Sequence, residues 1–363
     1  MRTRYFSLLT AYVFFLLAGC KAGQKQEGLS TFINKKADSL YKFEKIPGIF
    51  IGVLNNGERS FYSFGFADPD KKMPFDSSTL FEIGSITKTF TAYVLEFALR
   101  GKNISDSSSI INYLPDSVKT NKALEKISFL SLMNHTSGLP RLPENMDLYS
   151  NTMAPYDDYT AAHLFSYLKT CVPRPNGKSN YSNLGAGLAG VLAERITGKP
   201  YHRLLNECVF TPFKMSYHPD SSIATTANKA QGYFISTDNK AAYWNADVLA
   251  PAGGLKCSVS EMLSYLQAMS IPINEESKEI IADLLNPTIA VAPGMKVAKA
   301  WHTIEKEGKP VIYWHNGGTY GFSTFAGFLK DQNKAVVVVV NQFNKNQFSD
   351  ELGISIIQKL VAK

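Results

Sequence analysis

The pattern of apolar and polar residues predicts strands at both ends of the chain. Near the N-terminus, residues 29–44 have apolar side chains at helical spacing, and the turn Asn55-Asn56-Gly57 separates two apolar runs, 49–54 and 59–66. Asn-Gly between such runs is typical of a β-hairpin. Near the C-terminus, three runs predict strands and a longer one predicts a closing helix: 311–314, 322–329, 335–341 and 349–361.

Between these ends the pattern is mainly helical, with loops rich in Pro and Gly. The expected helices are 85–100, 108–113, 128–134, 160–169, 184–196, 201–208 and 258–269. We therefore predict an α/β (α+β) fold, in which an antiparallel sheet built from both chain ends is flanked by helices and a mostly helical domain is inserted. The sheet subdomain is expected to comprise 29–80 plus 290–363, and the helical subdomain 81–289.

The composition is that of a folded protein. Of 363 residues, 45% are hydrophobic and 19% are charged, which argues against disorder. The formal net charge is +7, but the Lys and Arg residues are scattered, so we expect no nucleic-acid partner. Neither Cys-x-x-Cys nor His-x-x-x-His occurs, so we expect no metal site, and we expect no cofactor.

The first residues have the features of an export signal. Arg2 and Arg4 precede an apolar run, 8–17, that is too short for a membrane span. The following Leu-Ala-Gly-Cys resembles the lipobox of bacterial lipoproteins. We interpret 1–19 as a signal peptide, Cys20 as the lipidated residue and 20–28 as a tether. The alternatives are an uncleaved anchor or an ordinary signal peptide.

A lipoprotein of this kind is expected in the bacterial cell envelope. Lys21 follows the cysteine, where aspartate is associated with retention at the inner membrane, and this favours the outer membrane, facing the periplasm. We expect a monomer. Cys171, Cys208 and Cys257 remain, which permits one disulfide but no disulfide framework.

Three local groups carry candidate chemistry. They are Ser85-Ile86-Thr87-Lys88 at a predicted helix start, Tyr181-Ser182-Asn183 before a Gly-rich helix, and His315-Asn316-Gly317-Gly318 at the end of a predicted strand. Residues three apart share a helix face, so Lys88 can act on the Ser85 hydroxyl.

The same spacings occur elsewhere. Ser39/Lys42 and Ser166/Lys169 repeat the first, and Tyr149/Asn151 and Tyr243/Asn245 repeat the second. In the order given, these four pairs lie in an amphipathic helix, at a helix end, in a polar loop and in a stretch with no clear element. Context favours Ser85/Lys88 and Tyr181/Asn183.

The order of the three groups resembles that of the penicillin-recognising serine hydrolases, which comprise class C β-lactamases, serine DD-peptidases of the same branch and related esterases. These proteins carry Ser-x-x-Lys, Tyr-x-Asn and then Lys-Thr-Gly or His-x-Gly. The resemblance covers about residues 29–361 and includes three further stretches: 132–140, 194–201 and 251–255. It implies a β-lactamase/transpeptidase-like fold.

The resemblance also implies roles for the residues. Ser85 is the expected nucleophile, and Lys88 and Tyr181 are the base and the proton shuttle, in an order that the sequence leaves open. The backbone N–H groups of Ser85 and Gly318 are expected to form the oxyanion hole.

Asn183, His315 and Gly317 are expected to bind substrate. Asn183 offers an amide, and the glycine lets the strand approach closely. Many β-lactamases have lysine where His315 stands. A histidine partly charged at neutral pH holds a substrate carboxylate more weakly. His135 is expected to fix a turn, and most nearby aromatic residues are expected to be packing residues, although they can wall a pocket: Tyr149, Tyr156, Tyr159, Tyr243, Trp244 and Tyr320.

The predicted function is a serine hydrolase that acts through a Ser85 acyl-enzyme. Its expected substrate is a small molecule or is derived from peptidoglycan: a β-lactam, a D-amino-acid peptide or a small ester. One alternative is a DD-carboxypeptidase or a family VIII-type esterase rather than a true β-lactamase. Another is a non-catalytic penicillin-binding sensor lipoprotein. His315 weakens the β-lactamase case without excluding it.

Overall fold

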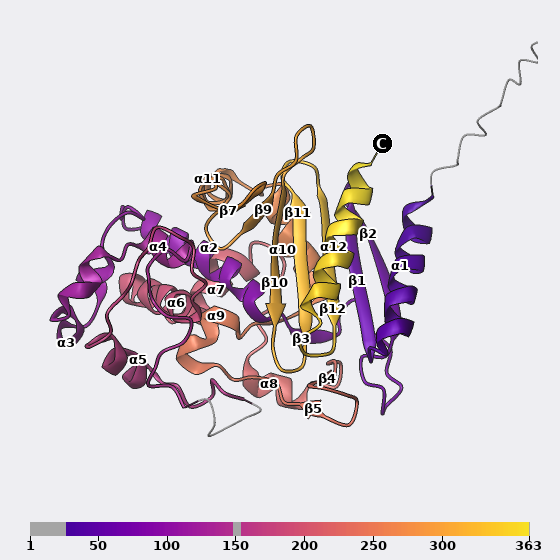
Figure 1. Cartoon of the computed structure of the whole chain (residues 1–363), viewed down its shortest axis with the longest axis horizontal. Coiled ribbons are helices and arrows are strands. Elements are labelled where there is room, and N and C mark those ends of the chain that lie inside the picture. Colours follow the sequence, from indigo (N-terminus) through magenta and orange to yellow (C-terminus); the bar gives the residue numbers. More distant parts are fainter. Residues whose placement is uncertain (1–26, 148–153, 363) are drawn as a thin grey trace, which may run out of the picture.

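The computed structural model of the protein describes residues 27–147 and 154–362 (Figure 1). The predicted signal peptide (1–19), Cys20, most of the tether, Tyr149 and Asn151 lie outside the described residues.

Both ends of the chain build one antiparallel sheet. In spatial order its strands are β2 (Glu58–Gly65), β1 (Gly48–Asn55), β12 (Lys334–Val340), β11 (Ser323–Leu329), β10 (Ile312–Gly318), β9 (His302–Ile304), β8 (Met295–Val297) and β7 (Ile289–Ala292). The N- and C-terminal parts join where β1 pairs with β12, with Ile51 opposite Val338. The sheet assembled from the two ends is thus confirmed.

The helices are α1 (Leu29–Glu44), α2 (Thr87–Arg100), α3 (Asp116–Lys119), α4 (Phe129–Met133), α5 (Ala161–Leu168), α6 (Asn183–Thr197), α7 (Tyr201–Leu205), α8 (Asp220–Thr225), α9 (Ala250–Gly253), α10 (Val259–Ser270), α11 (Glu275–Leu284) and α12 (Asn346–Val361). Shorter elements are the 3-10 turns η1 (Gly84–Ile86), η2 (Ile110–Tyr113), η3 (Lys122–Lys126) and η5 (Asp247–Leu249), the π-helix η4 (Asn206–Phe210), and the strand pairs β3 (Leu80–Glu82) with β6 (Lys256–Ser258) and β4 (Gly232–Tyr233) with β5 (Lys240–Ala241).

Helices cover both faces of the sheet. This explains why the sequence of strand β12 is a continuous run of valines. Val336 and Val338 lie in a core with Ile33 of α1 and Ile356 of α12. Val337 faces the opposite core, which contains α10 and the helical part of the molecule. Successive strand residues point to opposite faces, so a strand buried on both sides needs apolar residues throughout. Figure 1 shows α1 and α12 at the sheet end of the molecule and α3, α4, α5 and α6 at the other end.

The structure departs from the predicted elements in a few places. Residues 275–304 form α11 and the edge strands β7–β9, which the pattern did not predict, because these strands are short and partly exposed. In the helix expected at 201–208, the α-helical part ends at Leu205 and the π-helix η4 follows it. The segment 108–113, also expected to be a helix, contains only the 3-10 turn η2. The strand expected at 311–314 runs on through Gly318.

The three cysteines of the described residues are buried free thiols, so the disulfide that the sequence permitted is not formed among them. Within those residues, no helix has the length and apolar character needed to cross a membrane.

One glycine lets strand β10 lie directly against η1. A Cβ atom at Gly317 would stand 1.9 Å from the backbone oxygen of Ile83 and 2.5 Å from Oγ1 of Thr324. The first contact is with backbone, which cannot rotate away, so a side chain there forces the strand and the turn apart. Since η1 contains Ser85, Gly317 sets the distance between that serine and the sheet.

We therefore expect Gly317→Ala to lower the free energy of unfolding by about 1–3 kcal/mol, the usual cost of overpacking. Urea denaturation of the two proteins measures the difference. Gly101→Ala is the matched control, because a Cβ there meets its nearest atom at an ordinary 3.4 Å. Equal denaturation midpoints for Gly317→Ala and the wild type would contradict this account of the β10 contact.

Candidate active site

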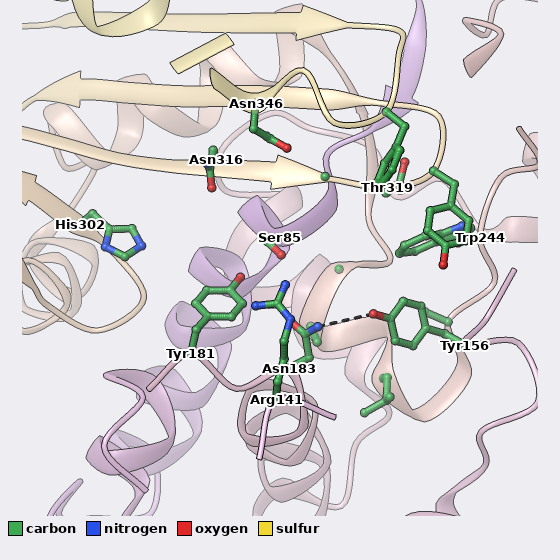
Figure 2. Close-up of a pocket in the computed structure, with 17 residues that line it drawn as sticks. Ser85, Arg141, Tyr156, Tyr181, Asn183, Trp244, His302, Asn316, Thr319 and Asn346 are labelled. Carbon is green, nitrogen blue, oxygen red and sulfur yellow. Dashed lines mark hydrogen bonds between the residues drawn. The ribbon is translucent and has the colours of Figure 1, made fainter. Parts of the chain in front are cut away.

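A cavity of about 490 Å³ lies where the helical part meets the end of the sheet (Figure 2). Its lining includes Ser85 from η1, Tyr181 from the segment before α6, Asn183 at the first position of α6, and Gly318 from β10. Segments far apart in the sequence thus bring the three predicted groups to one place. The competing pairs lie elsewhere: Ser39, Lys42, Ser166 and Lys169 are exposed, and Tyr243 and Asn245 do not line this cavity.

Ser85 occupies a tight turn that enters α2. Gly84 before it has φ +54°, a conformation that favours glycine, and the flanking Ile83 and Ile86 are buried. Lys88, one helical turn on, donates a hydrogen bond to Ser85 Oγ at 3.0 Å and a second to the carbonyl oxygen of Ala252. The predicted pairing of Lys88 with Ser85 is present in the structure.

The Lys88 amine is buried and its hydrogen bonds go to uncharged oxygens. The lysine is 2% exposed. Burial, with the positive charge of Arg141 as a second cause, places the pKa of Lys88 well below its ordinary value. The amine is therefore suited to accept a proton.

Tyr181 stands beside this pair. Its ring centroid is 4.9 Å from Lys88 Nζ and 5.1 Å from the Arg141 guanidinium carbon. Burial raises the pKa of Tyr181, although a hydrogen bond with Ser85 and the charge of Arg141 act in the opposite direction. The phenol is thus protonated and lies within reach of the serine.

His135 supports the tyrosine from behind. Its ring centroid is 4.5 Å from that of Tyr181, and its Nδ1 accepts the backbone N–H of Ser182 at 3.3 Å. Burial lowers the pKa of His135 to about 3, so the ring is neutral. His135 therefore holds the segment that presents Tyr181 and Asn183.

Asn183 presents an acceptor with no partner. Its Nδ2 lies 3.5 Å from the hydroxyl of Tyr156, and its Oδ1 is buried with no hydrogen-bond partner among the described residues. A buried polar atom without a partner is costly. Asn183 itself lines the cavity, and its contact with substrate stays a prediction.

Strand β10 has one free edge beside the cavity. It pairs with β11 through Gly318, but its pairing with β9 stops at Trp314. Asn316 and Gly318 line the cavity along the remaining edge. The structure places Gly317 against Ile83 rather than in the lining, so a contact of Gly317 with substrate stays a prediction.

His315 is neutral and faces inward. It is 1% exposed, and its ring centroid lies 5.2 Å from that of His302 and 6.3 Å from that of Tyr181. Burial, followed by the neighbouring His302 and Lys88, lowers the pKa of His315 well below its ordinary value. The expected partial charge at neutral pH is therefore wrong, and His315 does not line the cavity with the described residues.

Several lining residues escaped the sequence analysis, namely Arg141, His302, Thr319 and Asn346. The sequence carries a signal for two of them: Arg141 directly follows the stretch 132–140 that supplied part of the resemblance, and Thr319 directly follows the group that ends at Gly318. Of the aromatic candidates, Tyr156, Trp244 and Tyr320 line the cavity, whereas Tyr159 and Tyr243 pack outside it. Tyr156 contacts Trp244, and Trp244 contacts Tyr320, so these rings form a continuous wall.

A buried carboxyl group supports this wall. Glu82 accepts the backbone N–H of Trp244 at 2.5 Å and the hydroxyl of Thr319 at 2.7 Å. Burial raises the pKa of Glu82 to about 7, although Lys256 and both hydrogen bonds oppose the rise. Glu82 thus fixes two residues of the cavity from outside it.

A serine and a lysine one helical turn apart, facing a tyrosine at the end of an antiparallel sheet, define the class of the penicillin-recognising serine hydrolases. The family model described as Beta-lactamase matches residues 33–360, and the chain belongs to this family of hydrolases.

Individual relatives agree. The chain is 29% identical to a β-lactamase of Providencia stuartii over 84% of each chain, and 30% identical to one of Pseudomonas fluorescens over 67% of this chain and 65% of that one. A β-lactamase/D-alanine carboxypeptidase structure from Pseudomonas syringae has a TM-score of 0.77, with 24% identity over 91% of this chain and 98% of that one. A class C β-lactamase structure from Rhodobacter sphaeroides also gives 0.77, with 21% identity over 91% and 99%. These two structures confirm the predicted fold.

The Glu82 carboxyl makes stability depend on pH. Its pKa is higher in the folded protein than the ordinary 4.5, so its stabilising contribution is present below that pH and is lost as pH rises through about 7. We expect the free energy of unfolding of Glu82→Gln, measured relative to that of the wild type, to be higher at about pH 8 than at about pH 5 by roughly 2 kcal/mol. Urea denaturation at both pH values measures this. Glu125→Gln, at an exposed position, should follow wild type, and a pH-independent difference for Glu82→Gln would refute the assignment.

Proposed function

We propose that the protein opens an amide or ester bond through an acyl-enzyme on Ser85. The observation that carries this proposal is the buried Lys88 amine, which lies 3.0 Å from Ser85 Oγ and contacts no charged partner among the described residues. A serine hydroxyl becomes a strong nucleophile only when an adjacent base takes its proton, and a neutral amine is such a base.

The chemistry proceeds in two halves. Ser85 Oγ attacks the substrate carbonyl carbon while its proton passes to Lys88 Nζ. The bond to the leaving nitrogen or oxygen then breaks, and the leaving atom takes a proton from the Tyr181 hydroxyl, which Lys88 reprotonates. Water next attacks the acyl carbon, gives up a proton to the same groups and releases the acid, which restores Ser85 Oγ–H.

The order of roles follows from the two pKa directions. The pKa of Lys88 is lowered and that of Tyr181 is raised, which favours Lys88 as the base and Tyr181 as the donor to the leaving group. The open edge of β10 is suited to pair with a substrate backbone, and the N–H groups of Ser85 and Gly318 are the candidate oxyanion donors. Asn183 Oδ1, which has no hydrogen-bond partner among the described residues, is the candidate acceptor for a substrate amide N–H.

The substrate class is a small amide or ester: a β-lactam, a D-amino-acid peptide or a simple ester. Relatives are named as β-lactamases, and one structural neighbour as a β-lactamase/D-alanine carboxypeptidase. The neutral His315 favours the carboxypeptidase or esterase alternative, because it supplies no charge beside β10 for a carboxylate.

Labelling of the nucleophile tests the mechanism. Protein lacking residues 1–20 should react with a fluorescent fluorophosphonate at Ser85, and peptide mass spectrometry identifies the site. Ser85→Ala should lose the label. Lys88→Met should react more slowly by about 100-fold or more, because general-base assistance contributes about 10²–10⁴-fold.

Ser39→Ala is the matched control, since Ser39 has the same spacing to a lysine but is exposed on α1. It should label like the wild type. Unlabelled wild type, or equal labelling of Ser85→Ala, would exclude this mechanism and favour a binding role. Turnover of a chromogenic cephalosporin, a D-alanyl-D-alanine peptide and a nitrophenyl ester then separates the substrates.

We also propose that the protein is a lipoprotein of the bacterial cell envelope, anchored through Cys20 in the outer membrane and facing the periplasm. The support is the charged start, the apolar run 8–17 and the Leu-Ala-Gly-Cys sequence. We expect Cys20→Ala to shift the protein from the detergent phase to the aqueous phase in Triton X-114 partitioning. Cys171→Ala, at a buried thiol, should leave the partitioning unchanged. Aqueous partitioning of the wild type would contradict the anchor.

A further inference from the structure

We infer that Arg141 is the residue that binds an anionic group of the substrate, a carboxylate placed on the helical side of the cavity rather than beside β10. The inference rests on the proposed Ser85 chemistry and names the class of substrate that the site selects.

The backbone of Arg141 is fixed next to the catalytic groups. Its carbonyl oxygen accepts the N–H of Asn183 at 2.9 Å and that of Leu184 at 3.3 Å. The preceding carbonyl, of Pro140, accepts the hydroxyl of Ser182 at 2.7 Å. The loop is therefore tied to the start of α6, and Arg141 moves with Tyr181 and Asn183 rather than independently of them.

The guanidinium extends into the cavity. Its carbon lies 5.1 Å from the centroid of the Tyr181 ring. Figure 2 shows it between Tyr181 and Asn183, on the side of both residues that faces Ser85. An arginine stacked on an aromatic face keeps its outward N–H donors available, and their planar fork matches the two oxygens of a carboxylate.

No acid among the described residues occupies that fork. Within residues 27–147 and 154–362, neither an ion pair nor a side-chain hydrogen bond engages the guanidinium, and the lining residues include no Asp or Glu. A cation in a cavity without a counter-charge gives the cavity a positive potential and attracts anionic ligands.

The other basic groups around the cavity do not supply this charge. Burial lowers the pKa of His302 to about 4, and the pKa values of Lys88 and His315 lie well below their ordinary values. An arginine stays charged at every pH of interest. Among the described lining residues, Arg141 is thus the one permanent cation, and it offers the hold on a carboxylate that the sequence had assigned to His315.

Two esters that differ in charge and by one methyl group test the inference: the 4-nitrophenyl ester of glutaric acid, whose other end is a free carboxylate, and its methyl ester, which is neutral. Wild-type protein should hydrolyse the charged ester with the higher kcat/KM. Arg141→Gln should lower kcat/KM for the charged ester by about 10- to 100-fold, mainly through KM, as expected for loss of a charge-assisted pair. For the neutral ester the change should stay below about threefold, the scale of a lost neutral contact.

The comparison is made on the plateau of each pH profile, because the charge of Arg141 also lowers the pKa of Lys88. Arg141→Lys should recover part of the preference, since it keeps the charge but not the fork. Arg203→Gln removes the same charge from an exposed position outside the cavity and should behave as wild type.

The outcomes separate this inference from the proposed function. Equal loss for both esters, no loss for either, or a wild type without preference for the charged ester overturns the role of Arg141. Hydrolysis of neither ester while Ser85 still takes the fluorophosphonate label also overturns it. Absence of that label in wild type overturns the Ser85 mechanism itself.

Discussion

The buried Lys88 amine is the constraint on which the rest of the site depends. Removing an ammonium ion from water costs several kcal/mol unless an opposite charge accompanies it. Here the amine meets a hydroxyl, a carbonyl oxygen and the face of the Tyr181 ring, with Arg141 nearby as a like charge. The neutral amine is the form that these surroundings favour. Burial is also the main cause of the lowered pKa values of His135 and His315, and the neighbouring basic groups lower them further.

The position of that amine depends on backbone contacts at the start of η1. Gly84 allows the turn to reverse into α2, and Gly317 allows β10 to touch the Ile83 carbonyl. Thr324 of β11 donates a hydrogen bond to the same carbonyl at 3.0 Å. The serine is thus fixed to β10 and to the fully buried strand β11. Without these contacts, a helix start with the same motif would not hold the serine hydroxyl at a fixed distance from the edge of β10.

Much of this arrangement could be predicted from the sequence, since the sheet from both ends, α1, α2, α6 and the pairing of Ser85 with Lys88 all follow from periodicity and motif order. The missed strands β7–β9 are three or four residues long, too short for alternation to be recognised. The wrong expectation concerned His315. The sequence correctly placed it at a strand end, but whether its ring meets water or Tyr181 depends on which face of β10 packs inward. Arg141 was missed because its neighbours, Tyr181 and Asn183, lie about 40 residues further along the chain.

Taken together, the charges of the site are divided by location. Lys88, His135 and His315 are buried, where loss of solvent keeps the amine and the imidazoles neutral. The permanent charge sits on Arg141, an exposed residue whose guanidinium keeps much of its hydration and so costs little to hold. A cation at position 315 would place the permanent charge among the buried neutral groups, and its charge would oppose protonation of Lys88 still further. Moving the charge to the loop before α6 leaves β10 with a neutral edge for the substrate backbone and gives the opposite wall the attraction for an anion.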